Sequence, residues 1–328
     1  MNRRHVFLLS AIVVIGLVVA ACYQPTQFID RPKTFDVISL SELQAFLGVT
    51  NNRIKIVFTN KQRSSLYLVD YSQTPVQAIK LNKPEGYVDS PLIDSSGKWI
   101  TYFTAGNGVY IQKLDPTAMP IIIDSSGTEP HWWIKPGTNE TYIVYSNNQY
   151  VEKGTLKTLL GYSTFKQRID ASGAKIGLRE IIADKPFNGG LSFDGKYLCT
   201  GYSDAAFYNI SASSAGGYLP IEYNASKTEP YQQICNSSIS TDPTNPAQMM
   251  FLCFSGEQYL DTSEVHQFFG RPTRQHEYVF IVDTNNTIKK YFQKPSVYDE
   301  WQDPEWSNNS HFFAALGKLI LMVPPTMA

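Results

Sequence analysis

The residues in this sequence that could do chemistry are carboxylates, histidines and cysteines, and none of them forms a familiar catalytic motif. The chain contains no G-x-S-x-G elbow, no H-E-x-x-H, no C-x-x-C and no phosphate-binding glycine loop. His131 follows Pro130, whereas His266 and His276 lie ten residues apart, with Glu264 just before them. A solvated loop is the simpler interpretation of that pair, so we predict no metal site and no cofactor.

The N-terminus has the pattern of an export signal. Arg3 and Arg4 precede an apolar run at residues 6–19, and small residues follow as far as Cys22. The run is too short for a typical membrane span. The Val-Ala-Ala-Cys sequence that ends at Cys22 resembles the bacterial lipobox, and this resemblance implies that Cys22 is lipidated. An uncleaved anchor, or an ordinary signal with an incidental cysteine, remains the alternative.

This pattern predicts a division of the chain into three parts. They are a lipoprotein signal peptide at residues 1–21, a lipidated tether at 22–33 and one domain at 34–328. Tyr23 follows the cysteine, so the family rule that an Asp at this place retains a lipoprotein in the inner membrane does not apply. The resemblance therefore implies a protein anchored by lipid in the bacterial outer membrane, facing the periplasm or the cell surface.

The elements that must position the remaining residues are short strands arranged in a repeat. Residues 91–114 predict an apolar strand, a Ser-Ser-Gly-Lys turn, an alternating strand at 99–103, a glycine-rich turn and a third strand. Related segments begin at Pro130, Gly189, Ser237 and Pro304, at spacings of 39, 59, 48 and 67 residues, and residues 51–58 match in part. A period near 40 residues is typical of β-propeller blades.

These spacings predict the fold. We expect an all-β, six-bladed β-propeller of four-stranded antiparallel blades, with insertions in blades 3 and 5. The first insertion, at residues 147–182, reads as an extended hairpin, and the second, at 257–274, contains a capped helical turn. Residues 34–40 alternate and could supply the strand that closes the ring.

The repeat also carries a family resemblance. The pattern Pro-x-aromatic-Ser-x-Asp/Asn-Gly/Ser before an alternating strand resembles the repeat of TolB-like propellers, the PD40 or WD40-like group, and Pro304 to Ser307 is its best copy. The resemblance covers residues 54–316, although blades 3 and 5 replace the Asp-Gly turn with 136–139 and 242–246. It implies fold more strongly than function, because such propellers mostly bind proteins or glycans and some are domains of peptidases or lyases.

Cysteine positions predict one crosslink. If Ser240 faces Gln248 in a hairpin, Cys235 faces Cys253, and facing strand positions lie about 4.5–5.5 Å apart at Cα, which a disulfide can span. Two buried thiols are the alternative. Cys199, in the middle of another predicted strand, is expected to be a small core residue.

The candidate site follows from the propeller, because the segments leading into the inner strands gather on one face around its channel. The candidate binding residues there are Glu129, His131, Asp299, Trp301, Asp303 and Glu305. Further acidic residues (Glu85, Asp89, Asp184, Glu229, Glu300) and aromatic residues (Tyr87, Trp132, Phe187, Tyr231, Tyr298) lie in the same segments. We predict an acidic, aromatic-rimmed channel mouth that can take a basic peptide, a cation or a sugar. Ordinary solvation of turns is the alternative.

Charge and site together predict a function. With 28 basic and 29 acidic residues, nothing indicates a nucleic-acid partner. We predict a non-catalytic binding or scaffold propeller that recognises an envelope protein or peptide at the channel mouth. The alternatives are a glycan-binding protein, a glycan hydrolase or lyase that uses two of Glu129, Asp299, Asp303 and Glu305, and a structural part of an envelope complex.

Overall fold

The structure, a computed structural model, describes residues 37–318 with gaps. The gaps are at 38, 48–49, 51–52, 61, 107, 154–155, 188, 201–205, 211–217, 221–233, 241–242, 244–246, 254–277, 286–287, 294–299 and 307–312. The predicted signal peptide, Cys22 and the tether lie outside the described residues, as does the insertion at 257–274. The chain divides into two compact units, one of Met1–Ile54 with Val69–Ala78 and one of Lys55–Leu68 with Ile79–Ala328.

Helix α2, Leu40–Leu47, belongs to the smaller unit. Its N-terminus is a capping box, in which the Ser39 backbone N–H donates to the Glu42 carboxylate at 2.9 Å and the Glu42 N–H donates to Ser39 Oγ at 3.2 Å. The Ser39 hydroxyl also donates to the Glu42 carboxylate at 2.6 Å, and this bond, together with the one from the Ser39 N–H, lowers the pKa of Glu42. The predicted closing strand at 34–40 is therefore wrong in its described part, because the cap starts a helix at Leu40. In the described residues no helix has the length and apolar composition to cross a membrane.

Twenty strands in the described residues form six antiparallel sheets, each built from strands that follow one another in the chain. The sheets are β1–β3 (Lys55–Thr59, Leu66–Asp70, Ala78–Leu81), β4–β7 (Val88–Ile93, Trp99–Thr104, Gly108–Lys113, Ile121–Asp124), β8–β11 (Gly127–Ile134, Thr141–Lys153, Leu156–Ile169, Lys175–Ala183), β12–β14 (Tyr197–Thr200, Ala206–Asn209, Tyr218–Pro220), β15–β18 (Ile234–Ile239, Gln248–Cys253, Tyr278–Asp283, Ile288–Gln293) and β19–β20 (Glu300–Trp306, Phe313–Lys318).

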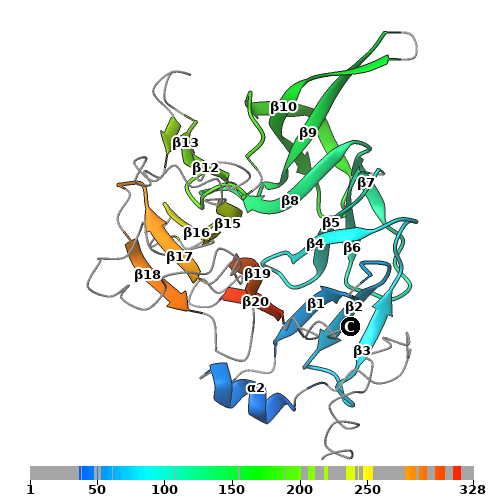
Figure 1. The fold of residues 1–328 in the computed structure, drawn as a ribbon. Coiled ribbons are helices and arrows are strands. Elements are labelled where there is room, and N and C mark those ends of the chain that lie inside the picture. Colours follow the sequence, from blue (N-terminus) through cyan, green and yellow to red (C-terminus); the bar gives the residue numbers. More distant parts are fainter. Residues whose placement is uncertain are drawn as a thin grey trace, which may run out of the picture. The chain divides into compact units, whose positions relative to one another are not determined.

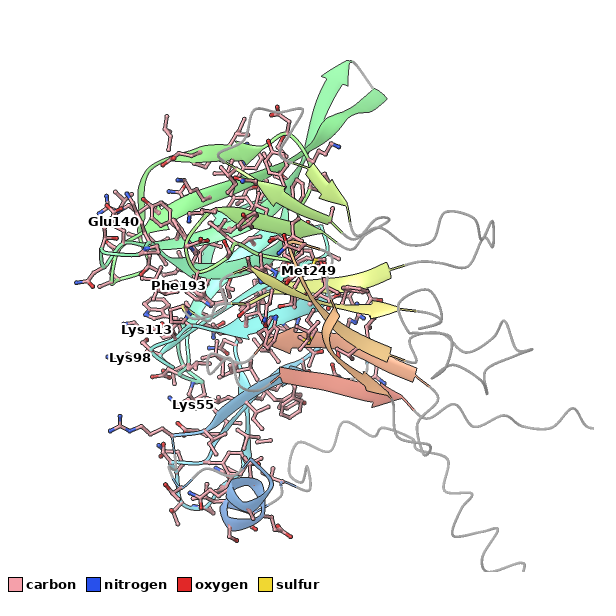
Figure 2. The ribbon with its side chains drawn as sticks, turned by 90° about the vertical axis from the view of Figure 1, so that its left-hand side faces the viewer. Lys55, Lys98, Lys113, Glu140, Phe193 and Met249 are labelled. Atoms are coloured by element: carbon pink, nitrogen blue, oxygen red, sulfur yellow. The ribbon has the colours of Figure 1, made fainter. Side chains whose placement is uncertain are left out.

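The turns that join first and second strands have the local chemistry that the sequence indicates. In the predicted Ser-Ser-Gly-Lys turn, Asp94 Oδ1 accepts hydrogen bonds from the N–H groups of Lys98 and Trp99 at 2.9 and 2.8 Å, and Gly97 has a φ of 67°. Lys98 and Glu140, from two such turns, and Phe193, from the turn before β12, lie on the same side of the larger unit (Figure 2). The first strands of successive sheets therefore run in the same direction.

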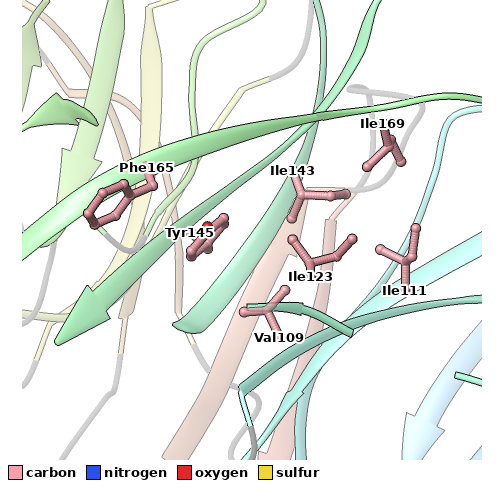
Figure 3. Packing of buried hydrophobic residues seen from close by; sticks show 7 residues of the cluster. All are labelled: Val109, Ile111, Ile123, Ile143, Tyr145, Phe165 and Ile169. Atoms are coloured by element: carbon pink, nitrogen blue, oxygen red, sulfur yellow. The ribbon is translucent and has the colours of Figure 1, made fainter. Parts of the chain in front are cut away.

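Successive sheets of the larger unit pack face to face. Figure 3 shows the cluster between the β4–β7 and β8–β11 sheets, which buries Val109, Ile111, Ile123, Ile143, Tyr145, Phe165 and Ile169. Comparable clusters lie between the β1–β3 and β4–β7 sheets and between the β8–β11 and β12–β14 sheets. A sheet with apolar residues on both faces needs a neighbour on each side, and four-stranded antiparallel sheets that stack in chain order are the construction of a β-propeller. The predicted architecture is confirmed at this level, and the number of blades stays a prediction.

Strands β9 and β10 are longer than β8 and β11, the other two strands of their sheet, and extend beyond them (Figure 1). Among the described residues, β8 pairs with β9 only over 141–147, and β11 pairs with β10 only over 164–169. Residues 148–153 and 156–162 pair with each other alone. An extended hairpin is therefore present within the predicted range 147–182, formed by residues 148–153 and 156–162, whereas residues 164–169 and β11 belong to the sheet itself.

The register between β15 and β16 corrects the disulfide prediction. Near the turn it is the predicted one, because Ile239 pairs with Met249. A register shift between Cys235 and Ser238 then moves the pairing by one residue, so that Cys235 pairs with Leu252 and Ile234 with Cys253. The direct opposition of the two cysteines on which the predicted disulfide depends is therefore wrong. Cys199, on β12, is fully buried, as expected of a core residue.

Candidate functional site

A β-bulge interrupts the first strand of four sheets. The register shifts at Ser90-Pro91 in β4, Glu129-Pro130 in β8, Asn236-Ser237 in β15 and Asp303-Pro304 in β19. In each case two residues of the first strand face one residue of the second strand. Three of these bulges contain a proline, which has no N–H group to donate to the ladder and is therefore found in strands mainly at edges and bulges.

The bulges in β4 and β8 hold non-glycine residues in a left-handed conformation. Ser90 has a φ of 47° and Glu129 a φ of 50°, and Arg63, in the β1–β2 connection, has a φ of 54°. These are the non-glycine residues with positive φ in the described part of the chain. For an L-residue this conformation costs on the order of 1–2 kcal/mol, and such strain is found more often at functional sites than elsewhere.

Hydrogen bonds and an ion pair join these three residues through Asp89. The Arg63 guanidinium pairs with the Asp89 carboxylate, whose Oδ1 accepts the Ser90 N–H at 3.1 Å. Ser90 Oγ donates to Glu129 Oε2 at 2.8 Å, which links β4 to β8. We call Arg63, Asp89, Ser90 and Glu129 the polar chain. It is open to solvent, since the side chains of Arg63 and Asp89 are 50% and 32% exposed and Ser90 and Glu129 are half-buried.

Two buried tyrosines lie opposite the bulges and support them. Tyr102 faces Ser90-Pro91 and Tyr145 faces Glu129-Pro130, and both are almost fully buried. Tyr102 Oη donates to Gln112 Oε1 at 3.0 Å, and Tyr145 Oη donates to Asp124 Oδ2 at 3.0 Å. Burial raises the pKa of each phenol above its usual range. Both therefore remain neutral hydrogen-bond donors in a close-packed base beneath the polar chain.

Of the six predicted binding residues, the structure describes the side chains of two. Glu129 belongs to the polar chain. His131 follows the same bulge, pairs with Val144 and is half-buried. Its ring lies against Gly190, where an added Cβ would be 3.0 Å from His131 Cγ. His131 therefore packs against the segment leading into β12, and glycine at 190 leaves room for it.

The other four predicted residues belong to the last repeat. Asp303 lies in the bulge of β19 and Glu305 follows it, so that Glu305 has the same place after its bulge as His131 has in β8. Trp301 pairs with Gly317. The side chains of these three residues, and Asp299 as a whole, lie outside the described part of the structure, and their place in a binding site stays a prediction.

The residues predicted for the channel mouth differ, where the structure describes them, from the acidic, aromatic rim that was expected. Asp89 lies beside Arg63, so the polar chain has mixed charge and is not uniformly acidic. The expected aromatic rim is wrong at Phe187, which is buried in a core cluster. Trp132 lies half-buried between two sheets and donates its Nε1–H to the Leu92 carbonyl at 2.9 Å. Tyr87, 60% exposed, does lie at the surface.

Sequence reasoning missed Arg63 and Ser90. Arg63 lies in the turn between β1 and β2, and its backbone carbonyl accepts a hydrogen bond from the Val88 N–H at 2.8 Å. No pattern in the sequence connects this turn with the start of β4. Ser90 did leave a signal, because a residue before proline in the middle of a strand indicates a bulge. The same signal is present at Glu129.

The polar chain can bind polar groups of both signs on a partner. Arg63 can donate to a carboxylate or a carbonyl, whereas Asp89 and Glu129 can accept from an ammonium or an amide N–H. Because the backbone beneath is fixed by the bulges and the buried tyrosines, these groups are held in place before a partner arrives. In the described residues no group of His, Cys, Asp and Glu has the arrangement of a metal site.

Comparisons with known proteins give similarities of fold. No family model matches the sequence, and no curated protein matches it. Among solved structures, TolB from Acinetobacter baumannii is 16% identical with a TM-score of 0.47, over 83% of this chain and 60% of that chain. A luciferin-regenerating enzyme is 9% identical with a TM-score of 0.47, over 85% of each chain. The β-propeller domain of Cps50 (Swd1) is 10% identical with a TM-score of 0.41, over 82% of this chain and 95% of that one.

Proposed function

We propose that this protein is a non-catalytic binding propeller that recognises a protein or peptide segment at the polar chain. The observation that carries this proposal is that the residues with a strained backbone are also the residues joined by polar side-chain contacts. Arg63, Ser90 and Glu129 all adopt a disfavoured backbone conformation, and all belong to one connected group, in which Arg63 lies in the β1–β2 turn and the other two on the first strands β4 and β8. A fold that needed only the bulges would be more stable with glycine at these positions.

The mixed charge of the polar chain favours a peptide as the ligand. An extended peptide presents N–H donors and C=O acceptors together with charged side chains, and the polar chain offers acceptors at Asp89 and Glu129 and donors at Arg63. The exposed Tyr87, which shortly precedes β4, adds a surface on which an apolar side chain can pack.

The sequence supports a location for this module. We propose six blades and a lipid on Cys22, with the tether at 22–33 holding the domain at the bacterial outer membrane, where the partner would be an envelope protein. An anchor of this kind raises the local concentration of the domain near its partner and adds no chemistry of its own.

The proposal is tested by crosslinking in intact cells. We expect the Ser90→Ala, Glu129→Gln double variant to capture at least tenfold less of a specific envelope protein than the native chain. Asp115→Asn is the matched control, because Asp115 caps a turn between β6 and β7, where its Oδ1 accepts the Thr117 N–H at 2.7 Å, outside the polar chain.

Three outcomes separate the interpretations. Loss of capture in the double variant and not in Asp115→Asn would support the polar chain as the binding site. Equal capture by all three proteins would place the contact elsewhere and overturn the proposed site. Retention of envelope glycan without any protein would overturn the peptide proposal in favour of a glycan-binding or glycan-cleaving propeller.

A further inference from the structure

Strand β11 forms the outer edge of the β8–β11 sheet, and very little of it is buried. Its first seven residues, 175–181, are exposed, and only Ile182 and Ala183 are not. Leu178 is 91% exposed, and Ile181 is 56% exposed. Because hydrophobic stabilisation is proportional to the apolar area removed from water, this strand gains little of it.

Charged side chains hold β11 in place instead. The Arg179 guanidinium pairs with Asp124 of β7 and lies 4.2 Å from the centre of the Phe165 ring. Glu180 pairs with Lys166 of β10 at 3.1 Å. Side chains of β11 thus reach both its own sheet and the outer strand of the preceding sheet.

The two ends of the Arg179–Asp124 pair are not equally fixed. The Asp124 side chain is 8% exposed, and it also accepts hydrogen bonds from Tyr145 Oη at 3.0 Å and Asn147 Nδ2 at 2.9 Å. The Arg179 side chain is 39% exposed. The carboxylate therefore belongs to the buried interface between two sheets, whereas the guanidinium belongs to the exposed strand that can leave it.

The ladder between β11 and β10 is broken in its middle. Lys166 pairs with Glu180 and Arg168 with Ile176, so that residues 177–179 face Gln167 alone. The Gln167 side chain fills the gap by donating its Nε2–H to the Ile176 carbonyl at 3.1 Å. A second register shift lies between Thr164 and Phe165. An interrupted ladder has fewer mutually supporting backbone hydrogen bonds than a regular one.

We infer that the exposed part of β11, residues 175–181, is a releasable edge segment, which detaches from β10 while β8, β9 and β10 stay paired. Ile182 and Ala183 stay packed in the core cluster between the β8–β11 and β12–β14 sheets. Release is controlled by charge, because side-chain ionic contacts and not apolar burial add to the backbone ladder of residues 175–181. Detachment uncovers the backbone N–H and C=O groups of β10 over 165–169, an edge that can accept an extended segment of a partner as an added strand.

Residue-resolved amide hydrogen exchange of the purified protein tests this inference. Strand β10 supplies its own reference, because some of its amides donate to β9 and the others to β11. We expect the amides facing β11 to exchange at least tenfold faster than those facing β9. Raising the salt from about 0.05 M to about 1 M should accelerate the amides facing β11 about threefold further, because the β11 partner of each ion pair, Arg179 or Glu180, is exposed and its charge is screened by salt.

Variants separate release of β11 from general loosening. Arg179→Gln should reproduce the acceleration at low salt, whereas Lys113→Gln should not, since Lys113 of β6 lies over the ring of Trp99 on β5, within the preceding sheet. A Lys166→Cys, Glu180→Cys pair, which joins facing positions of the two strands, should slow the amides facing β11 when oxidised and not when reduced.

Two results would overturn the inference. Amides of β10 that exchange equally slowly on both sides, with no response to salt or to Arg179→Gln, would show a permanently attached strand. Amides of β9 and β10 that all accelerate together would show that the whole sheet opens and that β11 is not a separate unit.

Discussion

The bulges of the first strands β4 and β8 and the bulge of β11 each contain a residue at positive φ, but the residue types differ. The first-strand bulges place Ser90 and Glu129 at positive φ, each followed by proline and each opposite a buried tyrosine. The bulge in β11 places a glycine, Gly177, at a φ of 66°, and an added Cβ there would have no atom within 4 Å. At Ser90 and Glu129 the backbone is therefore strained, and a glycine in either place would avoid that strain.

This difference separates two uses of an irregular strand. In β11 the bulge changes the path of an exposed edge, which protects an edge from pairing with other chains, and glycine is sufficient for that purpose. At Ser90 and Glu129 the side chains themselves make contacts, so replacing them by glycine would relieve the strain and remove the polar chain.

The base of the first-strand bulges should be the part of the molecule most sensitive to truncation. Tyr145→Ala removes a buried ring from the cluster between two sheets, together with its hydrogen bond to Asp124, and should lower the free energy of unfolding by about 3–5 kcal/mol. Leu178→Ala, at the exposed bulge, should change it by less than about 0.5 kcal/mol. Denaturant unfolding of both variants checks this, and a similar loss in both would contradict the contrast.

Substitution of Asp124 should cause the next largest loss of unfolding free energy, because its carboxylate joins the buried interface between two sheets to the exposed strand β11. Asp124→Ala leaves Arg179 without its ion pair and Tyr145 and Asn147 without their acceptor, and should lower the free energy of unfolding by about 3 kcal/mol. Asp115→Ala, at an exposed turn, is the control and should cost about 1 kcal/mol or less.

Acidification should remove part of the same stabilisation. Burial raises the pKa of Asp124, but hydrogen bonds from Ser126 and Tyr145, with the charge of Arg179, together hold it below the ordinary value of 3.8. A folded-state pKa below the unfolded one gives stability that is present above pH 3.8 and is lost as the pH falls through the lower, folded value. Unfolding free energies measured from pH 5 down to pH 2 should therefore fall less in Asp124→Asn than in the native protein, and equal slopes would contradict this assignment.

Gly177→Ala should have a smaller effect than the changes at Tyr145 and Asp124. The added methyl group meets no neighbour, so the cost is that of placing a non-glycine residue at positive φ, about 1 kcal/mol. Thermal unfolding measures this loss of stability. The β10 amides that face β11 should also exchange faster in the variant than in the native protein. A neutral result would show that the bulge rearranges without strain.

Much of the larger unit could be predicted from sequence, because its signals are local. Alternating residues define strands such as β5, and Asp94 and Gly97 define the turn before it. The same alternation misled at residues 34–40, where the cap between Ser39 and Glu42 was the stronger signal and starts a helix.

Register and long-range contact could not be predicted in this way. The bulge at Asn236-Ser237 adds one residue to β15, and nothing in the sequence beyond it shows that Cys235 then pairs with Leu252. Likewise, Arg63 reaches Asp89 from a turn that belongs to another sheet. The candidate site was therefore predicted at Glu129 and missed at Arg63 and Ser90, since only the fold brings them together.

We propose that strain at the first-strand bulges of β4 and β8 is retained for binding and not for folding. The most direct test is to measure the unfolding free energy and the partner capture of one double variant, Ser90→Gly with Glu129→Gly. Relief of strain offsets the lost hydrogen bond, so we predict a free energy of unfolding within about 1 kcal/mol of the native value. We predict that crosslinked capture of the envelope partner is lost. A variant that is destabilised by more than about 3 kcal/mol and still captures the partner would contradict the account.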